Sequence, residues 1–198
     1  MLRMLHVACL ALYGVIVLLF ADAPFRTVGQ RYVVQRSRPR LVLFTFELDL
    51  AALWAIAVFL FHWDRWLAPR ALDLALAVAG LLASLAGATL AGWAKLRLGR
   101  WFTATFGIKE GHELVTDGPY AVTRHPIYTG LLLMVLGAAL AWNSALTLLL
   151  ATLLVLPFFL HTVHEESLFE EHFGPAYLEY QERVPRLVPF AGAGRKKA

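Results

Sequence analysis

The stretch that decides the fold is Gly118-Pro119-Tyr120-Ala121-Val122-Thr123-Arg124-His125-Pro126-Ile127-Tyr128-Thr129-Gly130, which runs directly into the apolar residues 131–140. A polar signature therefore stands at the mouth of an apolar helix. Pro126 suits the first helical turn, because that turn has no use for the missing N–H. The unpaired N–H groups of the same turn attract anionic or acceptor groups. The sequence thus predicts a ligand site beside Arg124 and His125, at a membrane surface.

Composition indicates a membrane protein. The 198 residues are 59% hydrophobic and only 16% charged, with a mean hydropathy of +0.62, and soluble domains of this length rarely carry so little charge. The single cysteine, Cys9, excludes an internal disulfide. The net charge of +4 comes without a basic stripe interleaved with aromatic residues, so we expect no nucleic-acid partner.

Apolar spans are expected over residues 5–21, 41–61, 71–92, 127–142 and 145–161. A bilayer crossing needs ~20 residues, with ~17 as the short limit, so the fourth span is short and either tilts little or stops below the far surface. We expect the first span to be retained rather than cleaved as a signal peptide. Asn143-Ser144 is a polar turn that makes spans four and five an antiparallel helical hairpin, and Pro157 should kink span five. The predicted fold class is all-α: a polytopic membrane protein with five transmembrane helices.

The basic residues indicate the orientation of these spans. In a five-span arrangement all of the 18 Lys and Arg except Arg3, Arg65 and Arg70 fall on one side. The positive-inside rule then places the N-terminus outside and the C-terminus in the cytoplasm. We also expect the basic loops to contact membrane lipid headgroups.

The chain is predicted to be a single integral-membrane domain, residues 1–198, with two unequal roles along it. Residues 1–94 form a three-helix scaffold half with few polar side chains. Residues 95–198 form the catalytic half, with a cofactor-binding loop, the helical hairpin and a tail helix. The loop over residues 95–125 is long, so we expect either a functional lid or a partly embedded segment.

The tail after span five is expected to be a cytoplasmic C-terminal amphipathic helix. Its aromatic residues recur at steps of four, four and three, which marks one face: Phe169, Phe173, Tyr177 and Tyr180. Gly174-Pro175 should divide the helix in two. The aromatic face could pack on the headgroup layer or on the catalytic loop, and the sequence leaves both open.

A second polar cluster, His161-Thr162-Val163-His164-Glu165-Glu166, closes span five. In a hairpin this cluster meets Arg124 and His125 at one end, and that convergence indicates an enzyme. His161, His164 and Glu165 have a spacing that could bind a metal, but the ligand set is incomplete. No metal is therefore expected.

These motifs carry a resemblance that covers residues 112–189. The pattern comprises His112-x-Leu114-Val115, Gly118-Pro119-Tyr120, Arg124-His125-Pro126-x-Tyr128-x-Gly130, Glu165-Glu166, Phe173-Gly174-x-x-Tyr177-x-x-Tyr180 and Arg183-Val184-Pro185. It resembles the isoprenylcysteine carboxyl methyltransferase family. The R-H-P and E-E elements are similar to those of phospholipid N-methyltransferases.

The resemblance implies S-adenosylmethionine as the methyl donor, in a pocket facing the cytoplasm, and a lipophilic small-molecule or prenylated acceptor that enters from the bilayer. The residues it implies for cofactor binding are His112, Leu114, Val115, Gly118, Tyr120, Arg124, His125, Pro126, Tyr128, Gly130, Glu165 and Glu166. The expected catalytic residues are Arg124, His164 and Arg183. His164 is expected to act as a base where the acceptor needs one.

One departure from the family pattern bears on the acceptor. Prenylcysteine methyltransferases typically carry an arginine just before the E-E pair, and residues 161–164 contain none. Arg124 or Arg183 could hold a substrate carboxylate instead, and an amine, thiol or other lipid nucleophile stays open. The expected function is an integral-membrane S-adenosylmethionine-dependent methyltransferase like protein-S-isoprenylcysteine O-methyltransferase. The alternatives are a phospholipid amine N-methyltransferase and a non-catalytic membrane subunit.

Overall fold

The computed structural model describes residues 1–20, 31–35, 68–102, 107–153 and 155–188. Its helices are α1 (Leu2–Phe20), α3 (Asp73–Leu98), α4 (Pro126–Ala141), α5 (Ala145–Leu153), α6 (Val155–Phe173) and α7 (Pro175–Arg183). Short 3₁₀ turns are η2 (Arg70–Leu72), η3 (Gly99–Trp101) and η4 (Gly118–Ala121), and the strands are β1 (Tyr32–Gln35) and β2 (Gly107–Lys109). The described structure is mostly helical, as predicted, and the predicted second span, residues 41–61, lies outside the described residues.

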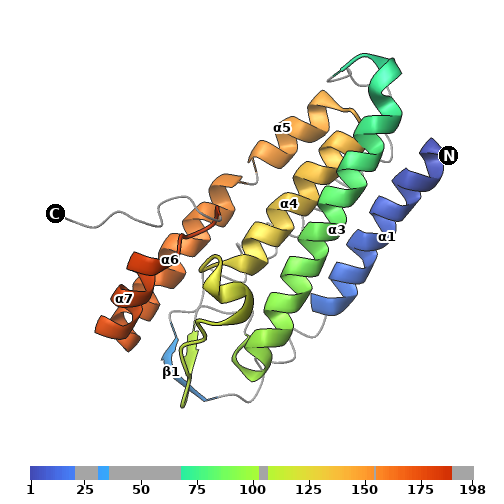
Figure 1. Cartoon of the computed structure of the whole chain (residues 1–198). Coiled ribbons are helices and arrows are strands. Elements are labelled where there is room, and N and C mark those ends of the chain that lie inside the picture. The colour runs from blue at the N-terminus through green and yellow to red at the C-terminus, as the bar shows by residue number, and fades with distance from the viewer. Residues whose placement is uncertain (21–30, 36–67, 103–106, 154, 189–198) are drawn as a thin grey trace.

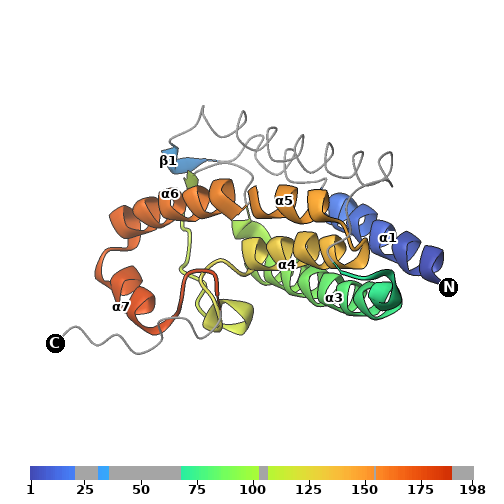
Figure 2. The same cartoon turned by 90° about the horizontal axis from the view of Figure 1, so that it is seen from above.

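The long helices lie side by side, with α3 between α1 and α4 and with α5 and α6 following α4 (Figures 1 and 2). Among the described residues, three helical segments are long and apolar enough to cross a membrane: Leu2–Phe20, Arg70–Trp101 and Ala145–Phe173. Helix α4 has 16 residues, just under the ~17 that span a bilayer at minimum. The described residues therefore support a polytopic membrane fold.

Helices α3 and α4 pack closely because glycines face one another. An added Cβ at Gly87 would lie 2.4 Å from the Gly130 carbonyl oxygen, and one at Gly80 would lie 2.3 Å from that of Gly137. Ser84 Oγ lies in the same seam and donates to the Met134 carbonyl at 3.2 Å. Small residues that let two backbones meet are the usual basis of helix association in lipid.

The end of the bundle away from Arg124 and His125 is closed by the predicted Asn143 turn. Asn143 adopts a φ of 49°. Its amide donates to the Ala68 carbonyl at 2.9 Å and to the Asp73 carboxylate at 2.7 Å. His6 stacks on Trp142 with ring centroids 4.7 Å apart. These contacts make α4 and α5 antiparallel neighbours, as the hairpin prediction required.

The last helical segment contains Pro157, and Gly174 follows its end. Pro157 is the third residue of α6 and cannot donate to the carbonyl of Leu153, the last residue of α5. The kink expected at Pro157 stays a prediction, because residue 154 lies outside the described residues. Gly174 takes a φ of 53° between α6 and α7, which glycine adopts without strain and which confirms the predicted division of the tail.

The described part of the loop over residues 95–125 folds onto the other end of the bundle. Lys95 is buried, and its Nζ donates to the Leu19 carbonyl, which joins the ends of α1 and α3. Lys109 is also buried and donates to the Phe102 carbonyl at 3.0 Å. Strand β2 pairs antiparallel with β1, a small sheet that the sequence did not predict. The loop is thus a packed wall built around two buried lysines.

Candidate active site

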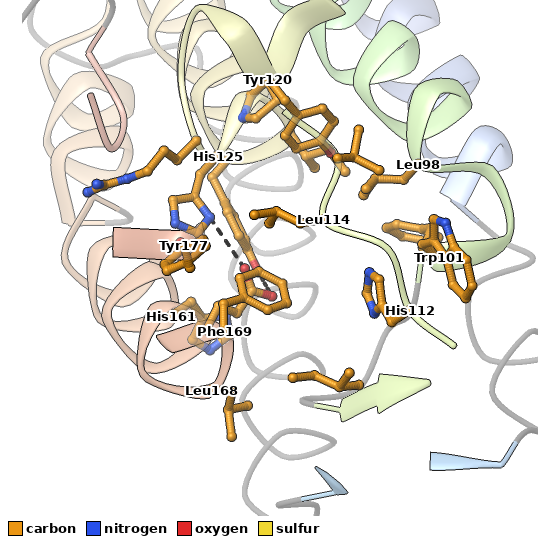
Figure 3. A pocket seen from close by; sticks show the side chains of 18 of the residues that line it. Leu98, Trp101, His112, Leu114, Tyr120, His125, His161, Leu168, Phe169 and Tyr177 are labelled. Atoms are coloured by element: carbon orange, nitrogen blue, oxygen red, sulfur yellow. Dashed lines mark hydrogen bonds and ion pairs between the residues drawn. The ribbon is translucent and has the colours of Figure 1, made fainter. Parts of the chain in front are cut away.

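A chamber lies at this end of the bundle, enclosed by the loop, the start of α4, α6 and α7 (Figure 3). Nine of the predicted cofactor residues line it: His112, Leu114, Val115, Tyr120, Arg124, His125, Pro126, Tyr128 and Glu165. The rest of the lining is mainly aromatic and aliphatic and includes Trp101, Phe158, Phe169, Phe173, Tyr177 and Tyr180. In Figure 3, His125 and His112 stand on opposite sides of Leu114. The motifs from the two halves of the hairpin therefore converge.

Glu166 lies behind the chamber wall and organises its polar end. Its side chain is 2% exposed. Its Oε1 lies 3.0 Å from Arg124 Nε and 3.0 Å from His125 Nε2. The Arg124 contact is an ion pair without the alignment of a hydrogen bond. The other oxygen, Oε2, accepts from Arg186 Nη2 at 2.5 Å. Since a buried carboxylate is stable only when paired, Glu166 is a structural centre here, although the sequence predicted a cofactor ligand.

His125 is held between two carboxylates. Its Nε2 lies 3.0 Å from Glu166 Oε1, and its Nδ1 lies 3.4 Å from Glu165 Oε2. A neutral imidazole has one N–H, and only the imidazolium can donate from both nitrogens. Burial disfavours that charge, but the hydrogen bonds to Glu165 and Glu166 outweigh it and raise the pKa of His125 above its ordinary value of 6.5. The two carboxylates therefore favour the imidazolium form of His125.

Glu165 differs from Glu166 because it reaches the chamber. Its side chain is 20% exposed, and it lines the chamber. Tyr128, two residues into α4 from Pro126, donates its hydroxyl to Glu165 Oε1 at 3.2 Å. Of the adjacent acids, one is thus a buried anchor and the other a chamber-facing carboxylate, as expected when neighbours on a helix point about 100° apart.

His112 supplies a polar atom to the opposite wall. Its ring stacks on Trp101 with centroids 4.9 Å apart and planes 9° apart. Burial lowers the pKa of His112 to about 4, so the ring is neutral near pH 7. Its Nδ1 is buried and has no hydrogen-bond partner in the described part of the chain. Buried polar atoms are nearly always satisfied, so this atom marks a place for a polar ligand group.

The aromatic face of the tail packs on the loop, one of the two positions that the sequence left open. Tyr177, Tyr180 and Val184 form a buried cluster with Leu114 and Phe169. Tyr180 donates its hydroxyl to the Tyr120 carbonyl at 2.6 Å. Burial raises the pKa of both tail tyrosines, so they remain neutral. The tail helix therefore forms part of the chamber.

Besides Glu166, four predicted residues stand outside the chamber lining. His164 is exposed on α6, and Arg183 is 66% exposed and pairs with Glu179 at 3.5 Å. Gly118 has a φ of 58°, and an added Cβ at Gly130 would lie 2.5 Å from the Gly87 carbonyl oxygen. The backbone angle at Gly118 and the close helix packing at Gly130 thus explain why glycine stands at these two positions. It adds no support to a catalytic role for His164 or Arg183, which stay predictions.

Several residues at the site were not among the predicted site residues, although His161 belongs to the second polar cluster. Phe158 and His161 line the chamber from α6, and their spacing of three and then four residues to Glu165 places all three on one helical face. That signal was readable in the sequence. Arg186 and Trp101 had no such signal, because their roles depend on contacts with Glu166 and His112 from distant segments.

A family model described as phospholipid methyltransferase matches residues 75–176. The chain belongs to the phospholipid methyltransferase family. The match covers α3, the loop, the hairpin and the start of α7, which are the elements that build the chamber.

Relatives of this chain are named isoprenylcysteine methyltransferases, which is the family that the sequence motifs resemble. Protein-S-isoprenylcysteine O-methyltransferase B of Arabidopsis thaliana is 35% identical over 114 residues, which cover 56% of this chain and 58% of that protein. The Xenopus laevis protein-S-isoprenylcysteine O-methyltransferase is 36% identical over 118 residues, 58% of this chain and 41% of that protein. The chain therefore spans less than two thirds of the relatives it matches.

A solved structure shares the fold. It is that of the eukaryotic intramembrane Ras methyltransferase ICMT (isoprenylcysteine carboxyl methyltransferase), with a TM-score of 0.53 and 26% identity, over 83% of this chain and 56% of that one. The sequence-based resemblance to this group is confirmed, and an intramembrane methyltransferase fold agrees with the apolar helices.

Proposed function

We propose that this protein is an integral-membrane methyltransferase that transfers a methyl group from S-adenosylmethionine to a lipophilic acceptor. The observation that carries the proposal is the chamber itself. It joins a charged end, made by Arg124, His125 and Glu165, to aromatic and aliphatic walls at one end of an apolar helix bundle. A polar donor and an apolar acceptor need such a combination in one space.

The residues present fit the donor. S-adenosylmethionine carries a carboxylate, an amine, ribose hydroxyls and an adenine, and when bound it supplies an electrophilic methyl group on a sulfonium. Arg124 offers a guanidinium for the carboxylate and Glu165 an acceptor for the amine or the hydroxyls. The Nδ1 of His112, which has no hydrogen-bond partner among the described residues, lies beside Trp101, and together they offer a hydrogen-bonding and stacking place for a ring. We assign the donor to these residues.

The protein's own contribution is binding, orientation and exclusion of water. Methyl transfer is an in-line displacement, so holding the nucleophile in line with the reactive carbon supplies much of the acceleration. His125 keeps its proton and fixes both carboxylates. For an acceptor that must lose a proton, we assign the base to His161, which lines the chamber, in place of the exposed His164.

The acceptor follows first from the relatives, whose names specify a protein-S-isoprenylcysteine. We propose a prenylated cysteine carboxylate or a similarly lipophilic acceptor. One observation favours the second candidate, a phospholipid amine. Among the described lining residues the one guanidinium is Arg124, and we have assigned it to the carboxylate of the donor. An amine acceptor needs no further cation, whereas a carboxylate does.

We further propose that the chamber faces the cytoplasm and that the fold has five membrane spans. Supporting this, the described basic residues gather at the chamber end, including Lys95, Lys109 and Arg124, while Arg3 and Arg70 belong to the opposite end. The positive-inside rule relates such a bias to cytoplasmic orientation.

The experiment that tests the function uses the full chain in lipid nanodiscs. Calorimetry with S-adenosylmethionine should show binding that Glu165→Gln weakens by about tenfold, since a charge-assisted hydrogen bond is worth roughly 1.5–3 kcal/mol. Radiolabelled donor should then methylate either a farnesylated cysteine or a phosphatidylethanolamine probe. Failure of the unaltered protein to bind the donor would remove the proposed function altogether.

A further inference from the structure

The segment that follows α7, residues 184–188, returns to the start of α4 and is bonded along it. Arg124 N–H donates to the Pro185 carbonyl at 2.9 Å, and His125 N–H donates to the Arg186 carbonyl at 3.1 Å. The Thr129 hydroxyl donates to the Leu187 carbonyl at 2.7 Å. The backbone of this C-terminal segment therefore fixes the backbone that carries Arg124 and His125.

Within the C-terminal segment, the Arg186 side chain contacts Glu166, the buried carboxylate behind the chamber wall. It does not line the cavity. It donates to Glu166 Oε2 from both Nε, at 3.0 Å, and Nη2, at 2.5 Å. Of the three cations around Glu166, it is the most exposed, at 30%, against 10% for Arg124 and 4% for His125. Arg186 thus lies between the buried carboxylate of Glu166 and the solvent.

The two oxygens of Glu166 have separate partners. Oε1 faces Arg124 and His125, which line the chamber. Oε2 is held by Arg186, with Gln181 at a longer 3.5 Å. Both Arg186 N–H donors converge on this single oxygen and fix its position, and the contacts of Oε1 with Arg124 and His125 then set the rotation of the carboxylate. As long as Arg186 holds Oε2, Oε1 is directed at the two chamber residues.

We propose that Arg186 is a positioning residue of the methyl-donor site: it acts through Glu166 to hold Arg124 and His125 in their binding geometry. The inference rests on the proposed function, since it concerns the site assigned there to S-adenosylmethionine. It also gives the C-terminal segment a role, because donor binding then depends on that segment being docked.

The groups that face His125 define what Arg186 should control. They are Glu165 and Glu166 from α6, Tyr128 from α4, Arg124 beside it, and the Arg186 carbonyl. If Arg186 positions Glu166, its loss lets the carboxylate rotate away, and the imidazolium of His125 loses one of its two anions. If Arg186 were only a nearby cation, its loss would instead make protonation of His125 easier. The two cases shift the His125 titration in opposite directions.

The test compares Arg186→Met and Arg186→Lys with the unaltered full-length protein in nanodiscs. Nitrogen-15 histidine NMR, without donor, follows the titration of His125, assigned by its absence in His125→Gln. The proposal expects the titration midpoint to fall in Arg186→Met and to recover in part in Arg186→Lys, which keeps the charge but loses the two-point contact. An unchanged midpoint, or a higher one, overturns the proposal.

Donor binding supplies the second readout. Calorimetry should show S-adenosylmethionine affinity falling about tenfold or more in Arg186→Met, the scale on which outer partners of binding residues act. The matched control is Arg97→Met. This variant removes a different arginine–carboxylate ion pair, between Arg97 and Asp117 at 2.5 Å, and neither residue lines the chamber. It should change affinity less than twofold. Equal affinity in Arg186→Met and the unaltered protein rejects the role of Arg186. Absence of binding in the unaltered protein rejects the proposed function instead.

Discussion

At the scale of single residues, the site depends on how charge is distributed between neighbours. Glu165 and Glu166 are adjacent in sequence, yet one lines the chamber and the other is a buried centre for Arg124, His125 and Arg186. With His125 protonated, three cations face two carboxylates. The surplus positive charge beside the chamber suits a ligand with a carboxylate.

The protonation of His125 leads to a prediction of pH dependence. Its folded-state pKa is raised above 6.5, so the stabilisation from its two ion pairs is complete below 6.5 and is lost as the pH rises through the raised value. Donor affinity should therefore be steady at mildly acidic pH and decline on the alkaline side. Calorimetry between pH 6 and pH 9 measures this.

The control for this prediction is His125→Gln, which removes the titrating group but leaves the donor's own amine titration in place. The difference between the two pH profiles then belongs to His125. An affinity difference that grows with rising pH would contradict the assignment of an imidazolium.

At the scale of elements, the contact between α3 and α4 sets the position of the site, because α3 ends at the loop and α4 begins directly after His125. That contact consists of glycines opposite backbone atoms. In lipid, such close packing takes the place of the hydrophobic driving force that associates helices in water.

Gly87→Ala should therefore destabilise the protein, since the new Cβ would lie 2.4 Å from the Gly130 carbonyl oxygen. Forced overpacking costs about 1–3 kcal/mol, and thermal unfolding in detergent should show a lower midpoint. The matched control is Gly14→Ala on α1, where nothing lies within 4 Å of the added Cβ. Equal midpoints for the two variants would mean that the seam is looser than the structure shows.

At the scale of the whole molecule, the chamber end and the Asn143 end are chemically different, and this difference predicts orientation. In a Cys9→Ala background, single cysteines at positions 113 and 183 belong to the chamber end, and one at position 70 belongs to the other. We expect a membrane-impermeant thiol reagent to label position 70 from outside intact cells, and positions 113 and 183 only after permeabilisation. Labelling of positions 70 and 113 from the same side would contradict the orientation.

The sequence by itself determined the features that local chemistry controls. Hydropathy placed α1, α4 and the starts of α3 and of the α5–α6 segment to within a few residues, and Asn143 and Gly174 marked a turn and a break. The motif around Arg124 and His125 and the E-E pair indicated both the family and most of the chamber lining. These signals are local because helix ends, turns and apolar length depend on neighbouring residues.

The tertiary structure alone decided which polar groups meet. The separation of Glu165 from Glu166, the stacking of Trp101 on His112 and the bonding of Arg186 to Glu166 all join segments that are distant or differently oriented. The same holds for Gly87 against Gly130, which reads in the sequence as two isolated glycines. Side-chain burial and pairing depend on the packed arrangement of helices, and a linear pattern cannot supply the rotation of each helix about its axis.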